Sequence, residues 1–182
     1  MMKLKFSLLF LFAALVVGAQ AQVKNLKLTN CVVVGQFDKP EDRFTIESAV
    51  TSLLNEYNVK TTPSVNYVKT GEDASILASD SLQNLLKEKG FDTYVIVSVR
   101  GYDRTFKPSK VKYPLAEKLD QGTLREIYRN GAVNVSFEFA FYRNKELVAT
   151  DIVKCTNISN RESTMKRFNK NVDSRIEKKW RK

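Results

Sequence analysis

The sequence predicts a single mixed α/β (α+β) domain over residues 22–182, with a sheet of about five strands and helices packed on it. Strand and helix patterns alternate as far as residue 100, which favours parallel strands joined by crossover helices. Two strand patterns then follow each other over residues 133–155, which favours an antiparallel hairpin. The chain has 182 residues, of which 43% are hydrophobic and 27% charged, so it has enough apolar material for one core.

The amino terminus has the pattern of a cleavable secretory signal peptide of 21 residues. Lys3 and Lys5 precede an apolar run of about 12 residues, which is shorter than the roughly 20 needed to cross a bilayer. An Ala-Gln-Ala step ends at Ala21, so we expect cleavage near Ala21/Gln22 and a mature protein in the periplasm or outside the cell. An uncleaved anchor is the alternative. The cleavage point lacks the cysteine of a lipid anchor, and we expect no transmembrane segment after cleavage.

The first strand and the first helix follow this leader. Residues 31–35 form a short apolar run rich in β-branched side chains, which is typical of a buried strand. Asp42 or Thr45 can cap the helix that comes next. Apolar residues recur along this helix at spacings of three and four. They are Phe44, Ile46, Ala49, Val50, Leu53, Leu54 and Tyr57.

The next two elements are a strand and a helix. Residues 59–68 have an extended pattern, and Pro63 places this strand at an edge of the sheet or near a strand start. Asp80 or Ser81 then caps a leucine-rich helix, and Gly90 ends it in a left-handed conformation.

The middle of the chain contains a strand, an irregular stretch and another strand. Residues 91–100 predict a second buried strand, and residues 101–130 show no regular pattern. Because a loop of about 30 residues is uncommon in a compact domain, we expect it to be functional or to hide a short helix within 115–128. Residues 133–142 alternate between apolar and polar, which predicts a strand with one face on the core.

The last elements are a hairpin and a helix. The dipeptide Asn144-Lys145 lacks the usual glycine but can join the strand before it to a returning strand at 146–155. Asn160 or Ser163 opens the final helix, whose apolar stripe includes Trp180 and whose opposite face is basic. Trp180 either packs in the core or belongs to an amphipathic helix that docks on a membrane or a partner.

Two cysteines, Cys31 and Cys155, remain after cleavage and lie at the ends of predicted strands. In an oxidising compartment they can form one disulfide, and the alternative is two independent buried thiols. The chain has no histidine, which removes the usual general base near neutral pH and the commonest metal ligand. We therefore expect no metal site and no cofactor.

Several of these segments contain core residues that together match the pattern of a known domain. It includes the helix residues Ile46-Glu47-Ser48-Ala49-Val50, the step Pro63-Ser64, and Gly90-Phe91-Asp92 at the start of a strand. The pattern resembles the periplasmic α/β domain of the amino-terminal part of TolB, of the curli secretion channel, and of related envelope proteins of unknown function. The resemblance covers roughly residues 30–100, and more weakly 133–155. It implies a binding or assembly module and transfers no functional residue.

A basic segment forms the candidate binding site. The formal net charge is +10, and +8 remains once Lys3 and Lys5 are removed. Basic and aromatic residues interleave from residue 100 onward, an alternation that suits an anionic polymer or an anionic membrane surface. A solvated surface loop is the alternative. The candidate anion- or partner-binding residues are Arg100, Tyr102, Arg104, Phe106, Lys107, Lys110 and Lys112.

These observations predict a non-enzymatic binding or assembly accessory protein of the bacterial cell envelope. Its partner would be an envelope protein, an anionic envelope polymer or a membrane surface, and we expect no specific nucleic acid. Asp38, Glu41 and Asp42 cluster after the first strand, and two of them could act as acid and base in an envelope-glycan hydrolase. Helix capping in a solvated turn is the simpler use of these carboxylates. A third alternative is a structural subunit that adds a partner strand to an exposed sheet edge.

Overall fold

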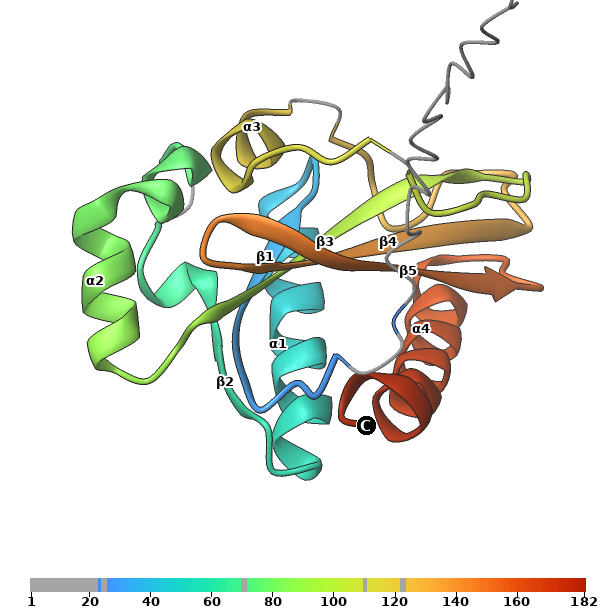
Figure 1. Cartoon of the computed structure of the whole chain (residues 1–182). Coiled ribbons are helices and arrows are strands. Elements are labelled where there is room, and N and C mark those ends of the chain that lie inside the picture. The colour runs from blue at the N-terminus through green and yellow to red at the C-terminus, as the bar shows by residue number, and fades with distance from the viewer. Residues whose placement is uncertain (1–22, 24–25, 70–71, 110, 122–123) are drawn as a thin grey trace, which may run out of the picture.

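Five strands form one mixed sheet in the order β2-β1-β3-β4-β5 in the computed structural model, which describes residues 23, 26–69, 72–109, 111–121 and 124–182 (Figure 1). The strands are β1 (Asn30–Gln36), β2 (Lys60–Pro63), β3 (Thr93–Tyr102), β4 (Asn134–Arg143) and β5 (Glu146–Thr156). β1 pairs in parallel with β2 and β3, whereas β3, β4 and β5 are antiparallel. The predicted mixed sheet is therefore confirmed. The predicted signal peptide lies outside the described residues.

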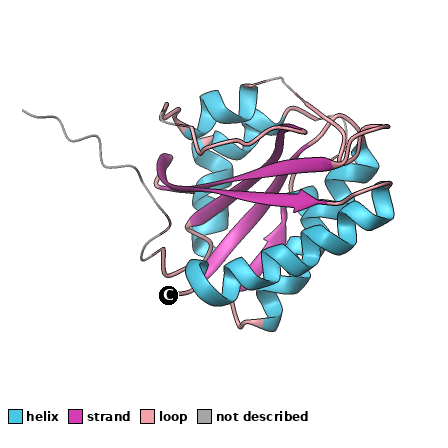
Figure 2. Cartoon of the chain, turned by 90° about the vertical axis from the view of Figure 1, so that its right-hand side faces the viewer, coloured by secondary structure: helices cyan, strands magenta, loops and turns pink. Residues whose placement is uncertain are grey.

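Helices cover both faces of this sheet, as Figure 2 shows. They are α1 (Pro40–Glu56), α2 (Asp80–Glu88), the short α3 (Leu115–Asp120) and α4 (Arg161–Arg175), which continues as a π-helical turn over Ile176–Trp180. α1 and α4 pack on one face of the sheet, and α2 and α3 contribute to a second core cluster on the other face. The short helix expected within 115–128 is confirmed as α3. Among the described residues, no helix is long and apolar enough to cross a membrane.

The larger core cluster is rich in aromatic side chains at its carboxyl-terminal end. Phe139 and Phe141 of β4 lie 4.7 Å and 5.3 Å from the ring of Trp180, measured between ring centroids. Trp180 is fully buried, and its Nε1 donates a hydrogen bond of 3.0 Å to Asp151. Edge and tilted contacts of this kind add to the free energy of burial. Core packing of Trp180 is thus confirmed, and docking of this side chain on a membrane is not.

The start of α1 differs from its predicted form. Lys39 is the N-cap residue and Pro40 occupies the first helical position, a position that suits proline because it needs no N–H there. The prediction that Asp42 or Thr45 caps this helix is therefore wrong. Phe44, which the spacing predicts on the apolar stripe, is 61% exposed. α2 begins one residue earlier than predicted, since the side chain of Ser79 caps it.

Two predictions about β4 have opposite outcomes. The prediction of one buried face is wrong, because residues 135–142 are all buried and the second cluster covers the other face. The hairpin at Asn144-Lys145 is confirmed. Both residues have positive φ, 48° and 66°, which is the conformation of a type I′ turn and matches the twist of the strands. The capping box of Asn160 and Ser163 confirms the start of α4.

The predicted disulfide between Cys31 and Cys155 is wrong, because the two thiols are free and far apart. Cys31 lies in β1 beside the start of β3, whereas Cys155 pairs with a β4 residue that opposes Tyr102 at the end of β3. Along the strand direction, the two cysteines are therefore separated by about eight residues of extended chain, or roughly 26 Å. A disulfide requires α-carbons within about 7 Å. Both thiols are buried, and burial raises the pKa of each to about 12. The alternative of independent buried thiols holds.

Candidate binding surface

The basic segment starts on β3 and crosses the end of the sheet. Tyr102 is half-buried, and its hydroxyl donates a hydrogen bond to the carbonyl of Glu126. The guanidinium of Arg129 lies over the Tyr102 ring, 4.5 Å from the ring centroid. Burial raises the pKa of Tyr102 above its usual value. The ring of Tyr102 therefore packs against the protein's own cation.

Phe106 also folds inward. Its ring lies so close to Gly101 that a Cβ at that position would overlap it, so this contact requires glycine. Asp103 fixes the turn between these two residues, since its Oδ1 accepts hydrogen bonds from the amides of Val133 (3.0 Å) and Asn134 (2.9 Å). The two aromatic side chains of the predicted set thus anchor the segment to the sheet.

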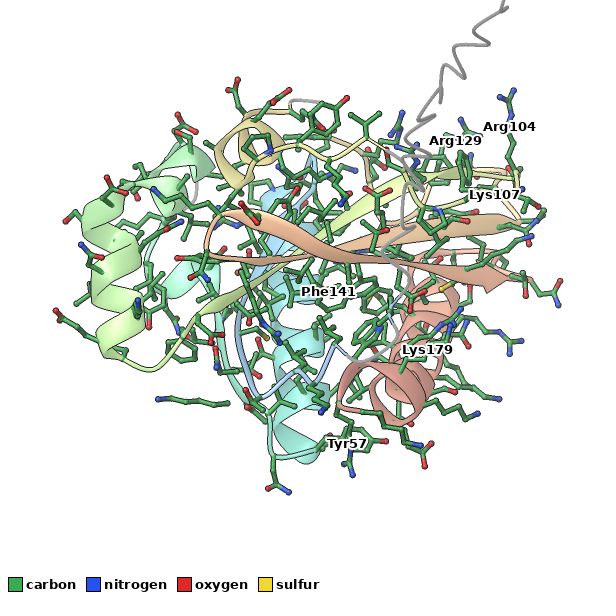
Figure 3. The ribbon with its side chains drawn as sticks, in the orientation of Figure 1. Tyr57, Arg104, Lys107, Arg129, Phe141 and Lys179 are labelled. Atoms are coloured by element: carbon green, nitrogen blue, oxygen red, sulfur yellow. The ribbon has the colours of Figure 1, made fainter. Side chains whose placement is uncertain are left out.

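The cations of the segment point outward. Arg104, Lys107 and Lys112 are exposed, and none has a carboxylate within 4 Å among the described residues. Figure 3 shows Arg104 and Lys107 together with Arg129 at the end of the sheet where β3 finishes. We call these three residues the basic end. The predicted set lacked Arg129, which joins the group through its tertiary contact with Tyr102. Lys110 lies outside the described residues.

Arg100 has a different environment from the basic end. It lies on the opposite face of β3 from Tyr102, and its Nε is 3.7 Å from the Glu138 carboxylate of β4. Lys118 of α3 donates a hydrogen bond of 3.2 Å to the other oxygen of the same carboxylate. A cavity of about 40 Å³ adjoins these three side chains, and residues of the basic segment form part of its wall.

A hollow of about 360 Å³ lies at the carboxyl end of β1, where ligands usually bind in open α/β sheets. Asp38, Arg43 and Glu72 contribute its charged groups. Asp42 faces elsewhere: it is buried, pairs with Arg161 at 2.9 Å and accepts a hydrogen bond from the amide of Ile127. The predicted carboxylate group of Asp38, Glu41 and Asp42 therefore does not converge on this hollow.

A buried network shapes the wall of the same hollow. The carboxylate of Glu47 accepts hydrogen bonds from the amide of Gly35 (2.9 Å), the hydroxyl of Ser64 (2.7 Å) and the amide of Val65 (3.0 Å). Arg43 pairs with Glu47 at 2.9 Å. Glu47 and Ser64 belong to the pattern of core residues described above, and their contact holds β1, α1 and the end of β2 together. Among the described residues, no group of three or more potential ligands could hold a metal ion.

Comparisons with known proteins identify no family for this chain. No family model and no curated protein matches the sequence. Lipoprotein GNA1162 from Neisseria meningitidis is 12% identical, with a TM-score of 0.44 over 80% of this chain and 96% of the other. The PelC dodecamer from Paraburkholderia phytofirmans is 10% identical, with a TM-score of 0.43 over 86% of each chain. Likeness at this level carries no functional inference. The fold and surface define a mixed α/β domain with a cluster of exposed cations at one end of its sheet.

Proposed function

We propose that this chain is an exported, non-enzymatic accessory protein of the bacterial cell envelope that binds an anionic envelope polymer through its basic segment. The observation that carries this proposal is the outward grouping of Arg104 and Lys107 with Arg129. Lys39 and Arg161, in contrast, lie 2.9 Å from the carboxylates of Glu126 and Asp42. Arg129 lies 3.8 Å from the carboxylate of Asp103, whereas Arg104 and Lys107 have no carboxylate within 4 Å among the described residues. Cations without a carboxylate partner keep their full attraction for a polyanion at low salt.

The positions of the aromatic side chains favour a polymer over a membrane surface. A protein that lies on a bilayer usually inserts large apolar or aromatic side chains at the interface. Tyr102 and Phe106 are the two aromatic residues of the predicted set, and they pack against Arg129 and Gly101, respectively. Attachment through charge alone fits a flexible anionic chain.

A matched pair of triple variants tests this function. Replacing Arg104, Lys107 and Lys112 with alanine removes three exposed charges from the segment. Three such contacts at about 0.5 kcal/mol each amount to about 1.5 kcal/mol, or roughly a tenfold loss of heparin affinity. The control replaces three other exposed lysines, Lys69 in a loop, Lys87 in α2 and Lys89 at the carboxyl end of α2. It removes the same charge and should leave the affinity nearly unchanged. Equal losses in both variants would contradict a local site.

The same two variants distinguish the polymer from a membrane. We expect the unmodified protein to be retained on heparin but to co-sediment only weakly with vesicles that contain phosphatidylglycerol. Strong vesicle binding that the segment variant abolishes would instead favour attachment to a membrane surface.

A structural subunit would add a partner strand to an edge of the sheet, but both edges of this sheet disfavour such pairing. On β5, the amide of Ile152 donates to the side chain of Asp151, and the carbonyl of Ile152 accepts from Arg175 of α4. The carbonyl of Lys154 accepts a hydrogen bond of 2.9 Å from Asn171. The opposite edge is β2, which has four residues and contains Pro63. Such features block edge-to-edge pairing.

A second candidate function, an envelope-glycan hydrolase, is favoured by one observation. Asp38 and Glu72 both line the 360 Å³ hollow, and two carboxyl groups about 5–10 Å apart can cleave a glycosidic bond. Release of reducing ends from purified envelope glycan, abolished by both Asp38→Asn and Glu72→Gln, would support this activity. If the unmodified protein releases none, this candidate is excluded.

A further inference from the structure

The face of β4 and β5 beneath the basic segment carries buried polar side chains. Ser136, Glu138 and Thr150 are 1%, 4% and 7% exposed. Burial of a carboxylate or a hydroxyl costs free energy unless hydrogen bonds compensate for it. The second core cluster on this face is built from aliphatic and aromatic residues, so the polar area is distinct from it.

Glu138 is at the centre of this polar area and is only partly satisfied. Its Oε1 accepts a hydrogen bond of 3.2 Å from Lys118. Its Oε2 is buried and accepts no hydrogen bond from the described residues, since Arg100 Nε lies 3.7 Å away. Buried carboxylate oxygens are nearly always hydrogen-bonded in native proteins, so an unpartnered one requires an explanation.

A cavity of about 40 Å³ gives Glu138 room for an additional partner. Since one water needs about 10–15 Å³ of such space, the cavity can hold roughly three waters or a similar number of oxygen atoms from a ligand. Its outer wall comes from the basic segment, through Ser109, Val111 and Tyr113. Val111 is 52% exposed, so part of this wall also faces solvent.

We propose that this cavity, the Glu138 pocket, binds the carboxylate and a neighbouring hydroxyl of an acidic sugar residue, such as a uronic acid. Arg100, Lys118 and Glu138 together carry a formal charge of +1, which one carboxylate balances. The sugar hydroxyl donates a hydrogen bond to Oε2 of Glu138. Sulfate and the phosphate dianion offer no such donor, and each carries two negative charges where the three side chains balance only one. A neutral sugar supplies the donor but leaves the cations unbalanced.

This assignment deepens the proposed function and rests on it, because the basic segment both holds the polymer and forms the pocket wall. Arg104 and Lys107 attract an anionic glycan without selecting its sugars. The Glu138 pocket then selects chains whose sugars carry both an acid and a hydroxyl group. Tyr113, which lines the pocket, provides an aromatic surface for the sugar ring.

The experiment is a titration of the purified mature protein with digalacturonate, followed by amide NMR and calorimetry. We expect shifts at Glu138, Thr150 and Ser109, and much smaller shifts there with sulfate or with neutral cellobiose. Glu138→Gln keeps the shape of the side chain but replaces one acceptor oxygen with an amide donor. Loss of a hydrogen bond to a charged group should weaken digalacturonate binding about tenfold or more.

A second variant keeps the proposal testable if Glu138→Gln fails to fold. Ser109→Phe fills the pocket from the loop that lines it and should abolish the digalacturonate shifts, while the affinity for dextran sulfate, which is anionic but has no carboxylate, should stay intact. Equal affinity in the unmodified protein and in both variants would overturn the pocket. Shifts confined to Arg104, Lys107 and Arg129 would do the same and leave the proposed function standing. Binding of digalacturonate in the pocket without any loss of heparin retention in the Arg104, Lys107 and Lys112 variant would refute the proposed function instead.

Discussion

Replacing Trp180 with alanine removes the side chain that ties the carboxyl-terminal turn to the sheet. Trp180 is fully buried, and its ring contacts Phe139 and Phe141 at centroid distances of 4.7 Å and 5.3 Å. Its indole N–H also donates a 3.0 Å hydrogen bond to the buried carboxylate of Asp151. Two separable interactions therefore depend on this one residue.

Their magnitudes follow from the packing and the hydrogen bond. Truncation of a fully buried aromatic side chain costs about 3–5 kcal/mol of unfolding free energy. Trp180→Phe keeps most of the apolar contact but removes the donor to Asp151. Asp151 then retains the more distant Arg175, at 3.7 Å. Loss of a hydrogen bond to a charged group should cost about 1.5–3 kcal/mol, so we expect Trp180→Phe to lie between the unmodified protein and Trp180→Ala.

The assay is urea unfolding followed by far-ultraviolet circular dichroism, because the chain has a single tryptophan and its variants lack that fluorescence. A separate measurement on the unmodified protein tests whether Trp180 stays in the core. Adding anionic vesicles should leave its tryptophan emission unchanged. A cost below about 1 kcal/mol for Trp180→Ala would refute the packing argument. A blue shift of the emission with vesicles would show that Trp180 docks on membranes.

Three further predictions concern buried groups. Intact mass should be the same with and without reductant, and Cys31 and Cys155 should react with a thiol reagent only after unfolding, because both are buried; a mass difference of two hydrogen atoms would contradict this. Because burial raises the pKa of both thiols from 9.0 to about 12, the native state keeps protons that the unfolded chain releases. Stability should therefore fall as the pH rises from 9 toward 12, less steeply in a Cys31→Ala/Cys155→Ala variant, and parallel pH profiles would refute the cause. Glu47→Gln should lower the unfolding free energy by about 3–5 kcal/mol, because it leaves the Arg43 charge largely buried without its partner; a urea midpoint like that of the unmodified protein would exclude this role.

Elements with a strong local pattern could be predicted from the sequence. The β-branched run at 31–35, the capping residue Asn160 and the left-handed Gly90 all specify their structure within a few neighbouring residues. The order of these patterns also predicts the division into parallel and antiparallel strands. Local signals of this kind require no knowledge of what packs against each element.

Features that depend on distant segments could not be predicted in this way. Ser136 and Glu138 alternate with apolar residues, a pattern typical of a solvent-facing side, but both are buried, and Lys118 of α3 contacts Glu138. The distance between Cys31 and Cys155 depends on the strand order, because β3 and β4 separate their strands. The candidate site also has a local part and a tertiary part. Arg104 and Lys107 can be identified from the sequence alone, whereas Arg129 and the Glu138 pocket follow only from tertiary contacts.

The salt dependence of heparin affinity tests the central claim most directly. Calorimetry at several salt concentrations would compare the unmodified protein with the variant in which Arg104, Lys107 and Lys112 are alanine. If these side chains contact the polymer, the logarithm of the affinity should fall steeply with the logarithm of salt concentration, and the variant should show a clearly smaller slope. Identical slopes for the two proteins would show that the polyanion binds elsewhere and would contradict the proposed surface.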